Sequence, residues 1–222
     1  MQSVKHSTVR YLCCRSQAPH PAFLLAGPID LGRQLSGLIT DYTRWFFSIP
    51  IEVSQANPSE TGANCGLSQD GPVWNLLGQN TPIFTLHCNV PAGKAIFLPA
   101  LGYAYDFPYP ERYPQLPPGH RLETFQRGLS AEFIDGISFA AMTLDGKPMT
   151  LRRASTGVHS FTAAKSWANW DTCVTGSPQL VQNDGLWALI DPPSVGRHTI
   201  NLKLAHPAFG AIDGTWVLNA AR

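Results

Sequence analysis

The sequence has few charged side chains and no long apolar segment, and both shortages narrow what the chain can be. Charged residues make up 14% of its 222 residues, against about a quarter in an average soluble domain. Lysine and arginine number 16 and aspartate and glutamate 15, which leaves a net charge of +1. We therefore expect no attraction to nucleic acid or anionic lipid. No run approaches the roughly 18 apolar residues of a transmembrane helix, so no membrane span is predicted.

Motifs that define several large enzyme classes are also missing. The sequence contains no GxSxG, HExxH, Walker A or GxGxxG motif, which gives no support for an α/β serine hydrolase, a zincin, a P-loop enzyme or a Rossmann dehydrogenase. Residues 91–94 (PAGK) are similar to a cupin turn, but the cupin metal-binding histidine cluster is absent. The histidines are scattered, and a site assembled across strands from His87, His159 and His198 is left open. We predict no cofactor and no metal.

The first 29 residues show no sustained periodicity and are predicted to form a loose arm before a single domain at 30–222. Arg15, Gln17 and prolines interrupt the short apolar stretches of this arm, so the sequence alone predicts no signal peptide. No second cysteine pair with zinc-finger spacing follows Cys13 and Cys14. Five cysteines leave at least one unpaired, and the roles of Cys13, Cys14 and Cys173 are left open.

What the sequence does contain is many turns and short β-forming segments. It has 19 prolines and 19 glycines, and its 44% of hydrophobic residues is enough for a core. Residues 73–77, 83–90 and 95–98 are apolar segments separated by turn residues, and 198–204 alternates between apolar and polar. Asp145-Gly146 is a strong hairpin signal. We therefore predict an all-β fold, an antiparallel β-sandwich of jelly-roll type.

One N-terminal amphipathic helix is predicted at residues 31–47. Its apolar side chains recur every three or four residues, Asp30 is a suitable N-cap, and Pro50 would end the helix. We expect its apolar face to pack on the sandwich. Residues 122–134 are consistent with either a weak helix or an irregular strap.

Two cysteines flank the first strands. Cys65 and Cys88 lie 23 positions apart (88 − 65), and a bridge between them would tie the entry loop to the sheet. On the chain-entropy account it would add roughly 3 kcal/mol of stability. Two unpaired thiols are the alternative, because cysteine count does not fix connectivity.

The strings TGANC, QDGPVWNLLG, CNVPAGKAIFLP, NDGLWALI and GRHTI occur in this order. They resemble motifs of a family of uncharacterised bacterial proteins that are usually exported, in which TGxxC, QxGPVWFLxG, CTVPAGKxIFFP, DGYW and GxHTI follow one another. The similarity runs from about Trp45 to the C-terminus. It departs at Asn75, where the family usually has an aromatic residue, and at Gly102, where an asparagine is common. The resemblance implies a β-sandwich and a secreted or periplasmic protein, and it implies no catalytic residues.

Residues 101–120 form the most unusual segment, because its prolines are expected to prevent pairing as a central strand. A stiffened loop of this kind would present flat rings and hydroxyl groups for stacking on a sugar or another planar ligand. The rings concerned are those of Tyr103, Tyr105, Tyr109 and Tyr113. Packing of these rings on the sandwich surface is the alternative.

A second aromatic group, Trp167 and Trp170, precedes Asp171 and suggests another binding patch, with core packing as the alternative. The catalytic candidates are acidic residues and one histidine near these aromatic groups: Asp106, Glu111, His159 and Asp171. Carboxylate pairs such as Asp106 with Glu111, or Asp171 with Asp184, would hydrolyse glycosides only if they lie about 5–9 Å apart. Cys173 beside a histidine would be a nucleophile pair.

Three functions are therefore open. The first is an exported domain that binds a carbohydrate or another planar small ligand through the aromatic groups. The second is a hydrolase or lyase acting on a polysaccharide or a small ester with Asp and His side chains of the same groove. The third is a structural surface protein that associates with itself. The expected partner is a small molecule or glycan, and the oligomeric state is not predicted.

Overall fold

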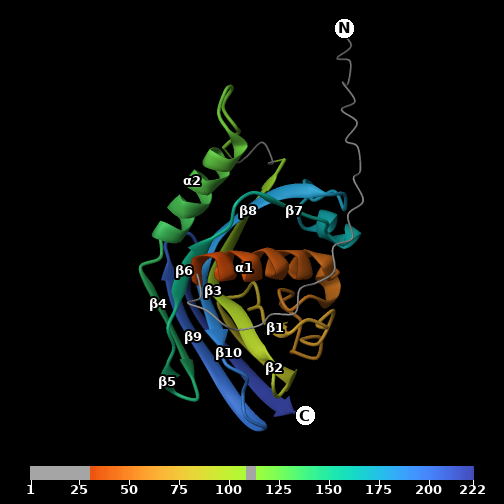
Figure 1. Ribbon diagram of the computed structural model, residues 1–222, viewed down its shortest axis with the longest axis vertical. Coiled ribbons are helices and arrows are strands. Elements are labelled where there is room, and N and C mark those ends of the chain that lie inside the picture. The colour runs from red at the N-terminus through yellow and green to blue at the C-terminus, as the bar shows by residue number, and fades with distance from the viewer. Residues whose placement is uncertain (1–30, 109–113) are drawn as a thin grey trace.

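The computed structural model describes residues 31–108 and 114–222, so the predicted N-terminal arm lies outside the described residues (Figure 1). Strands dominate this part of the chain. Its elements in order are α1 (Leu31–Ser48), η1 (Ile51–Val53), β1 (Val73–Asn75), β2 (Ile83–Pro91), β3 (Ala95–Phe107), α2 (Leu122–Asp135), β4 (Phe139–Leu144), β5 (Lys147–Pro148), β6 (Arg152–Ser155), β7 (His159–Phe161), η2 (Lys165–Asn169), β8 (Gln179–Ile190), β9 (Gly196–His206) and β10 (Gly210–Ala221). Within these residues, neither α-helix is long and apolar enough to cross a membrane.

The strands form two five-stranded sheets. The first has the order β1–β3–β8–β6, with β7 also paired to β8, and the second has the order β2–β10–β9–β4–β5. The predicted sheet-rich fold is confirmed. The prediction of purely antiparallel pairing is wrong, because β1 pairs with β3 and β2 pairs with β10 in parallel. Neither parallel pair is joined by a hairpin: β2 lies in the chain between β1 and β3, and β10 reaches β2 only at the end of the chain.

The facing sides of the two sheets share one hydrophobic cluster. In β2 every second residue is buried, from Phe84 to Val90, as expected for a strand with one face in a core. These side chains meet residues of β3 and β8 from the other sheet, such as Ile96 and Ala188. Trp216 of β10 is fully buried there, and its Nε1 donates to the carbonyl oxygen of Leu77 at 3.0 Å.

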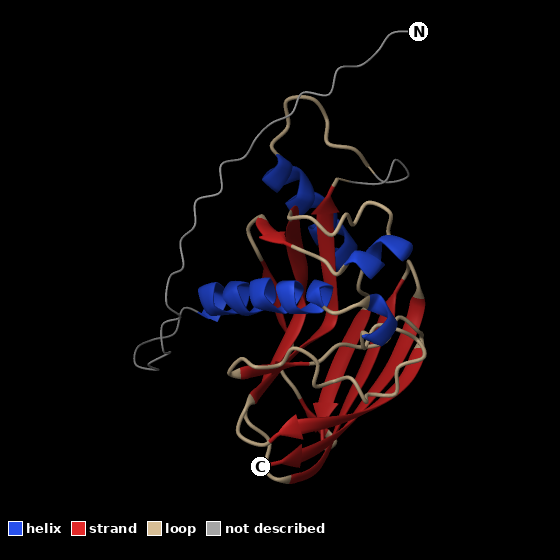
Figure 2. Cartoon of the chain, turned by 90° about the vertical axis from the view of Figure 1, so that its right-hand side faces the viewer, coloured by secondary structure: helices blue, strands red, loops and turns tan. Residues whose placement is uncertain are grey.

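Helix α1 lies across the opposite face of the first sheet (Figures 1 and 2). The predicted helix is confirmed and ends one residue later than expected, at Ser48. Its residue Tyr42 packs edge-on against Phe97 and Trp187, whose rings are stacked at 5.2 Å. Successive side chains of β3 point to opposite faces of the sheet. Ile96 therefore packs in the cluster between the two sheets, and Phe97 packs in a second cluster beneath α1.

A second helix, α2, replaces the irregular strap considered for this segment, so the fold is not all-β with a single helix. Its buried Ser130 donates to Oε1 of Gln182 on β8. Near its C-terminal end, the ring of Phe133 lies 4.4 Å from that of His206 on β9. Helix α2 therefore bridges the first sheet and one end of the second.

Strand β3 extends through residues that were predicted to be a loop. It continues to Phe107 and pairs with β8 throughout, with a bulge between Pro99 and Leu101. On its other side β1 ends at Asn75, opposite Phe97, so the remainder of β3 is an edge within the described residues. Proline is tolerated at bulges and on edge strands, which explains why Pro99 does not stop the strand.

The TGANC motif is a locked turn. Glu60 Oε1 accepts hydrogen bonds from the backbone N–H groups of Thr61, Gly62 and Asn64. The backbone N–H of His87 on β2 then donates to Thr61 O at 2.8 Å. The turn ends in a disulfide between Cys65 and Cys88, with the Cα atoms 5.5 Å apart, so the predicted bridge is confirmed.

The QDGPVWN string is also explained by packing. The side-chain amide of Gln69 bonds to both main-chain polar groups of Asn75, as a neighbouring strand would. Its Nε2 donates to Asn75 O at 2.5 Å, and its Oε1 accepts from Asn75 N at 3.0 Å. Lys94 Nζ lies over the ring of Trp74 and donates to Gln69 O. The most recognisable strings of the sequence therefore hold the irregular segment before β2 against the sheets.

Candidate functional site

An open groove with a volume of about 470 Å³ lies beside the middle of β3, where β1 has already ended. Its floor consists of core side chains, among them Phe84, Leu202 and Trp216. Its rim is formed by residues 78–82, by Trp167 of η2 and Trp170 directly after it, and by Phe209 in the turn between β9 and β10. The volume lies within the ~300–1,000 Å³ range of small-molecule sites.

Trp167 and Trp170 line this groove as a stacked pair. Their ring centroids lie 5.7 Å apart with an interplanar angle of 16°. Trp167 is buried against Phe46 and Phe47, and its Nε1 donates to Ile49 O at 2.8 Å. Trp170 is 46% exposed. The pair thus combines both alternatives from the sequence: Trp167 is a core residue, and it supports a second ring that solvent can reach.

Two carboxyl groups interact electrostatically outside the lining of the groove. Asp171 directly follows Trp170, and Asp106 lies four residues beyond the groove residue Gly102 along β3, roughly 13 Å at strand spacing. Burial raises the pKa of Asp106 to about 6, and the negative charge of Asp171 adds to this shift. Asp106 Oδ2 is buried and has no hydrogen-bond partner among the described residues. A carboxyl group with this pKa beside a second one is suited to proton transfer.

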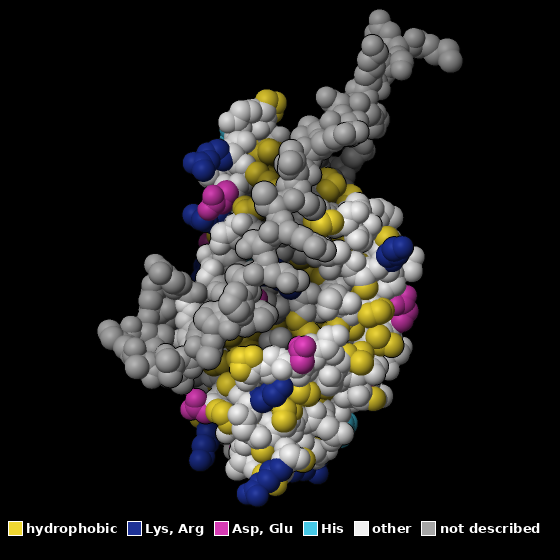
Figure 3. Space-filling view, turned by 45° about the vertical axis from the view of Figure 1, so that its right-hand side comes forward, with side chains coloured by type: hydrophobic (Ala, Val, Ile, Leu, Met, Phe, Trp, Pro, Cys, Tyr) yellow, Lys and Arg dark blue, Asp and Glu magenta, His cyan; other side chains and the backbone are white. Residues whose placement is uncertain are grey.

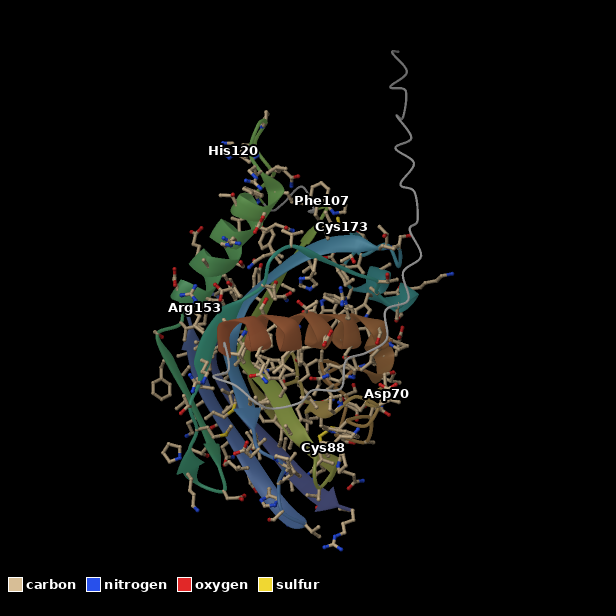
Figure 4. The ribbon with its side chains drawn as sticks, in the orientation of Figure 1. Asp70, Cys88, Phe107, His120, Arg153 and Cys173 are labelled. Carbon is tan, nitrogen blue, oxygen red and sulfur yellow. A yellow bond between two sulfur atoms is a disulfide. The ribbon has the colours of Figure 1, made fainter. Side chains whose placement is uncertain are left out.

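Gln179 holds the segment of Asp171 against β3. Its Nε2 donates to Cys173 O at 2.8 Å and to Phe107 O at 3.3 Å, while its Oε1 accepts from Thr175 N at 2.7 Å. Figure 4 shows Phe107 and Cys173 at the same end of the molecule, far from Cys88. Gln179 was not predicted as a site residue, because its role depends on contacts with two segments distant in sequence.

The predicted tyrosine group is only partly described. Tyr103 stacks on Phe133 of α2 with the ring centroids 4.0 Å apart, and Tyr105 is 7% exposed. These two rings therefore pack beneath α2 rather than standing on a loop, and neither lines the groove. Tyr109, Tyr113 and Glu111 lie outside the described residues. A ligand-binding role for the four tyrosines stays a prediction.

The histidines do not converge with the carboxyl pair. His159 of β7 lies opposite Val181 of β8, which in turn lies opposite Asp106, so a full strand separates the two side chains. Burial lowers the pKa of His159. His198 is bonded to Asp145 through Nδ1 at 2.7 Å, in the other sheet. Among the described residues, no three His, Cys, Asp or Glu side chains are grouped to hold a metal ion.

Asp184, considered as a partner of Asp171, has a different environment. It is 4% exposed and receives a hydrogen bond from Arg153 Nη2 at 2.9 Å. Arg153 also pairs with Asp135 at the end of α2. This pairing indicates that Asp184 anchors α2 to the first sheet.

The side chains that line the groove are uncharged. On the face drawn in Figure 3, hydrophobic side chains gather in patches with few charged groups between them. The sequence signalled this surface only through Trp167 and Trp170. The contribution of residues 78–82 and Phe209 depends on how the two sheets approach each other, which no local pattern encodes.

Comparisons of the chain with protein-family models, curated proteins and solved structures gave no match.

Proposed function

We propose that this chain is an exported ligand-binding domain that holds a carbohydrate or another small ligand with a planar ring in the groove beside β3. The observation that carries the proposal is the ring of Trp170, which is 46% exposed on the groove rim and backed by the buried Trp167. An exposed ring with a fixed orientation offers a stacking surface at little entropic cost.

Two observations support export. The Cys65–Cys88 disulfide is of a kind that persists mainly in oxidising compartments. The resemblance to usually exported bacterial proteins favours the same location. Jelly-roll connectivity also belongs to this proposal, since it rests on the same resemblance together with two sheets that share one core.

The binding proposal is tested with a panel of mono- and disaccharides and small aromatic compounds, monitored by thermal shift and calorimetry. We expect at least one compound to bind saturably to the intact chain and to lose at least tenfold in affinity in Trp170→Ala. Phe139→Ala is the matched control, because Phe139 is 55% exposed on β4 and does not line the groove. Binding that is unchanged in Trp170→Ala would refute the proposal.

The second candidate is a hydrolase or lyase, and the electrostatic influence of Asp171 on the raised pKa of Asp106 favours it. In this reading Asp106, whose pKa is raised to about 6, donates a proton to the leaving group while Asp171 acts as the base or nucleophile. We expect the activity to fall at least 100-fold in both Asp106→Asn and Asp171→Asn. In the parent chain it should decline as the pH rises above about 6. If a broad panel of glycosides and esters is not hydrolysed, binding is the better assignment.

A further inference from the structure

The charge of the groove lining restricts the ligand. The residues that line the groove come from seven parts of the chain, yet none of them is an aspartate, glutamate, lysine, arginine or histidine. A charged ligand group placed among these side chains would lose its hydration without gaining a counter-charge. The lining therefore favours an uncharged ligand.

The hydrogen-bond donors of the lining restrict the chemistry of the ligand further. Nε1 of Trp167 and of Trp216 already donate to backbone carbonyl oxygens. The Gln79 amide donates to Glu60 O, and the Thr81 hydroxyl donates to Ile83 O at 3.0 Å. Of the lining's side-chain donors, only the Asn80 amide and the Trp170 indole lack a bond within residues 31–108 and 114–222.

A sugar ring carries several hydroxyl groups, and each one that enters an apolar groove without a partner costs about 1–3 kcal/mol. Two side-chain donors can pair with only a few of the hydroxyl groups that a monosaccharide would place against this lining. An aromatic ring has no such requirement, and it gains by stacking on the exposed face of Trp170. The rest of the lining is mainly apolar, which allows contact with a ring without requiring further hydrogen bonds.

From these contacts we infer that the ligand of the groove is an uncharged aromatic molecule rather than a carbohydrate, stacked on Trp170 with at most one or two polar groups directed to Asn80. This inference rests on the proposed function, since it specifies the ligand of the same groove.

Four matched probes test it by calorimetry on the intact chain. They are 2-naphthalenemethanol, its carboxylate analogue 2-naphthoate, its ammonium analogue 2-naphthylmethylamine and methyl β-D-glucopyranoside. We expect the alcohol to bind, both charged analogues to bind at least tenfold more weakly, and the glucoside to show no saturable binding. Asn80→Ala should weaken binding of the alcohol by about threefold, and Trp170→Ala by at least tenfold, while Phe139→Ala should bind it as the unmodified chain does.

The outcomes separate the two claims. If the glucoside binds at least as tightly as the alcohol and does so through Trp170, this inference is wrong while the binding proposal stands. Equal or tighter binding of either charged analogue likewise contradicts the inference alone. If none of the four probes binds in a way that depends on Trp170, this inference fails, and the binding proposal is decided by the wider panel of saccharides and aromatic compounds described above. Both tryptophan and phenylalanine variants must keep the thermal transition of the parent chain, and Trp170→Phe replaces Trp170→Ala if the alanine variant unfolds.

Discussion

The side-chain amide of Gln179 donates to the main-chain carbonyl oxygen of Cys173 at 2.8 Å, and this bond fixes the segment that carries Asp171. The same nitrogen reaches Phe107 O at the end of β3. One buried glutamine therefore ties the segment that follows Asp171 to the end of the strand that carries Asp106.

Replacing Gln179 should loosen the segment that follows Asp171. Gln179→Ala leaves two carbonyl oxygens and the N–H of Thr175 without their partner, at a cost of about 2–3 kcal/mol in the free energy of unfolding. Gln179→Glu keeps the acceptor for Thr175 but loses both donated bonds, so its cost should be similar or larger. Urea unfolding measures the free energy of unfolding of both variants. A loss below about 0.5 kcal/mol in Gln179→Ala would show that these bonds do not hold the segment.

Asp106 should make the stability of the chain depend on pH. Its pKa is raised by burial to about 6 in the folded state, so the folded chain binds this proton more tightly than the unfolded chain does. Stability is therefore lost as the pH rises from about 4 to about 6. Asp106→Asn should remove this loss and be about 1–2 kcal/mol more stable than the parent at pH 7.5, with little difference at pH 4.

Asp171→Asn is the control for this pH effect. It removes the neighbouring negative charge but leaves the burial of Asp106, which is the larger cause of the raised pKa. The pH dependence of unfolding should therefore shrink but persist. NMR titration of the Asp106 carboxyl group checks the same point, and a midpoint below 4.5 in the parent chain would contradict it.

The sequence predicted the local features of this fold better than its long-range arrangement. Helix α1 follows from its 3.6-residue periodicity, and the turn at Asp145-Gly146 follows from the left-handed backbone that both residues adopt, with φ values of 50° and 78°. The full length of β3 was missed because Pro99 was taken to end the strand. Its actual position at a bulge on an edge is a property of the sheet, which no local pattern shows.

The candidate site illustrates the same limit. Trp170 and Asp171 were predicted as site residues from residue type, but the pairing of Asp171 with Asp106 was not, since Glu111 and Asp184 were considered instead. Asp171 comes close enough to affect the pKa of Asp106 because β8 pairs with β3 and Gln179 holds the segment after η2. Contacts of this kind depend on tertiary structure alone.

The locked turn at Gly62 should tolerate no side chain. Gly62 has φ of 101°, and a Cβ atom there would overlap the backbone of His87. Gly62→Ala should therefore cost about 2–4 kcal/mol, because the backbone strain and the steric overlap add. Gly37→Ala is the matched control: Gly37 lies in α1 with open space around it, and alanine should stabilise the helix by about 0.5–1 kcal/mol. Thermal unfolding separates the two.

The disulfide should stabilise the same turn from its other end. Cys65→Ala with Cys88→Ala is expected to lose about 3 kcal/mol, because the unfolded chain gains the freedom of the loop that the bridge closes. Both side chains are buried, so the lost packing adds to this value. Mass mapping without reductant provides the first check, and a free thiol at either position in the parent chain would end this prediction.

The ion pair between His198 and Asp145 should stabilise the chain only in an intermediate pH range. Asp145 and a bond to Ser194 raise the pKa of His198, and a hydrogen bond from His198 lowers the pKa of Asp145, with Lys147 contributing in the same direction. The contribution from His198 is complete below its unfolded pKa of about 6.5 and disappears as the pH rises through its higher folded pKa. That from Asp145 is present above about pH 4 and is lost as the pH falls through its lower folded pKa.

His198→Gln should therefore cost more stability at pH 5.5 than at pH 8.5, although the difference should stay below about 1 kcal/mol because both groups are near solvent. Asp145→Asn keeps an acceptor for Thr199 N–H, 2.8 Å away, and tolerates the left-handed backbone, whereas Asp145→Ala loses both features. The alanine variant should accordingly be the less stable of the two at every pH. Urea unfolding of the three variants at both pH values decides this, and equal effects of His198→Gln at pH 5.5 and 8.5 would mean that the pair carries no charge in the folded chain.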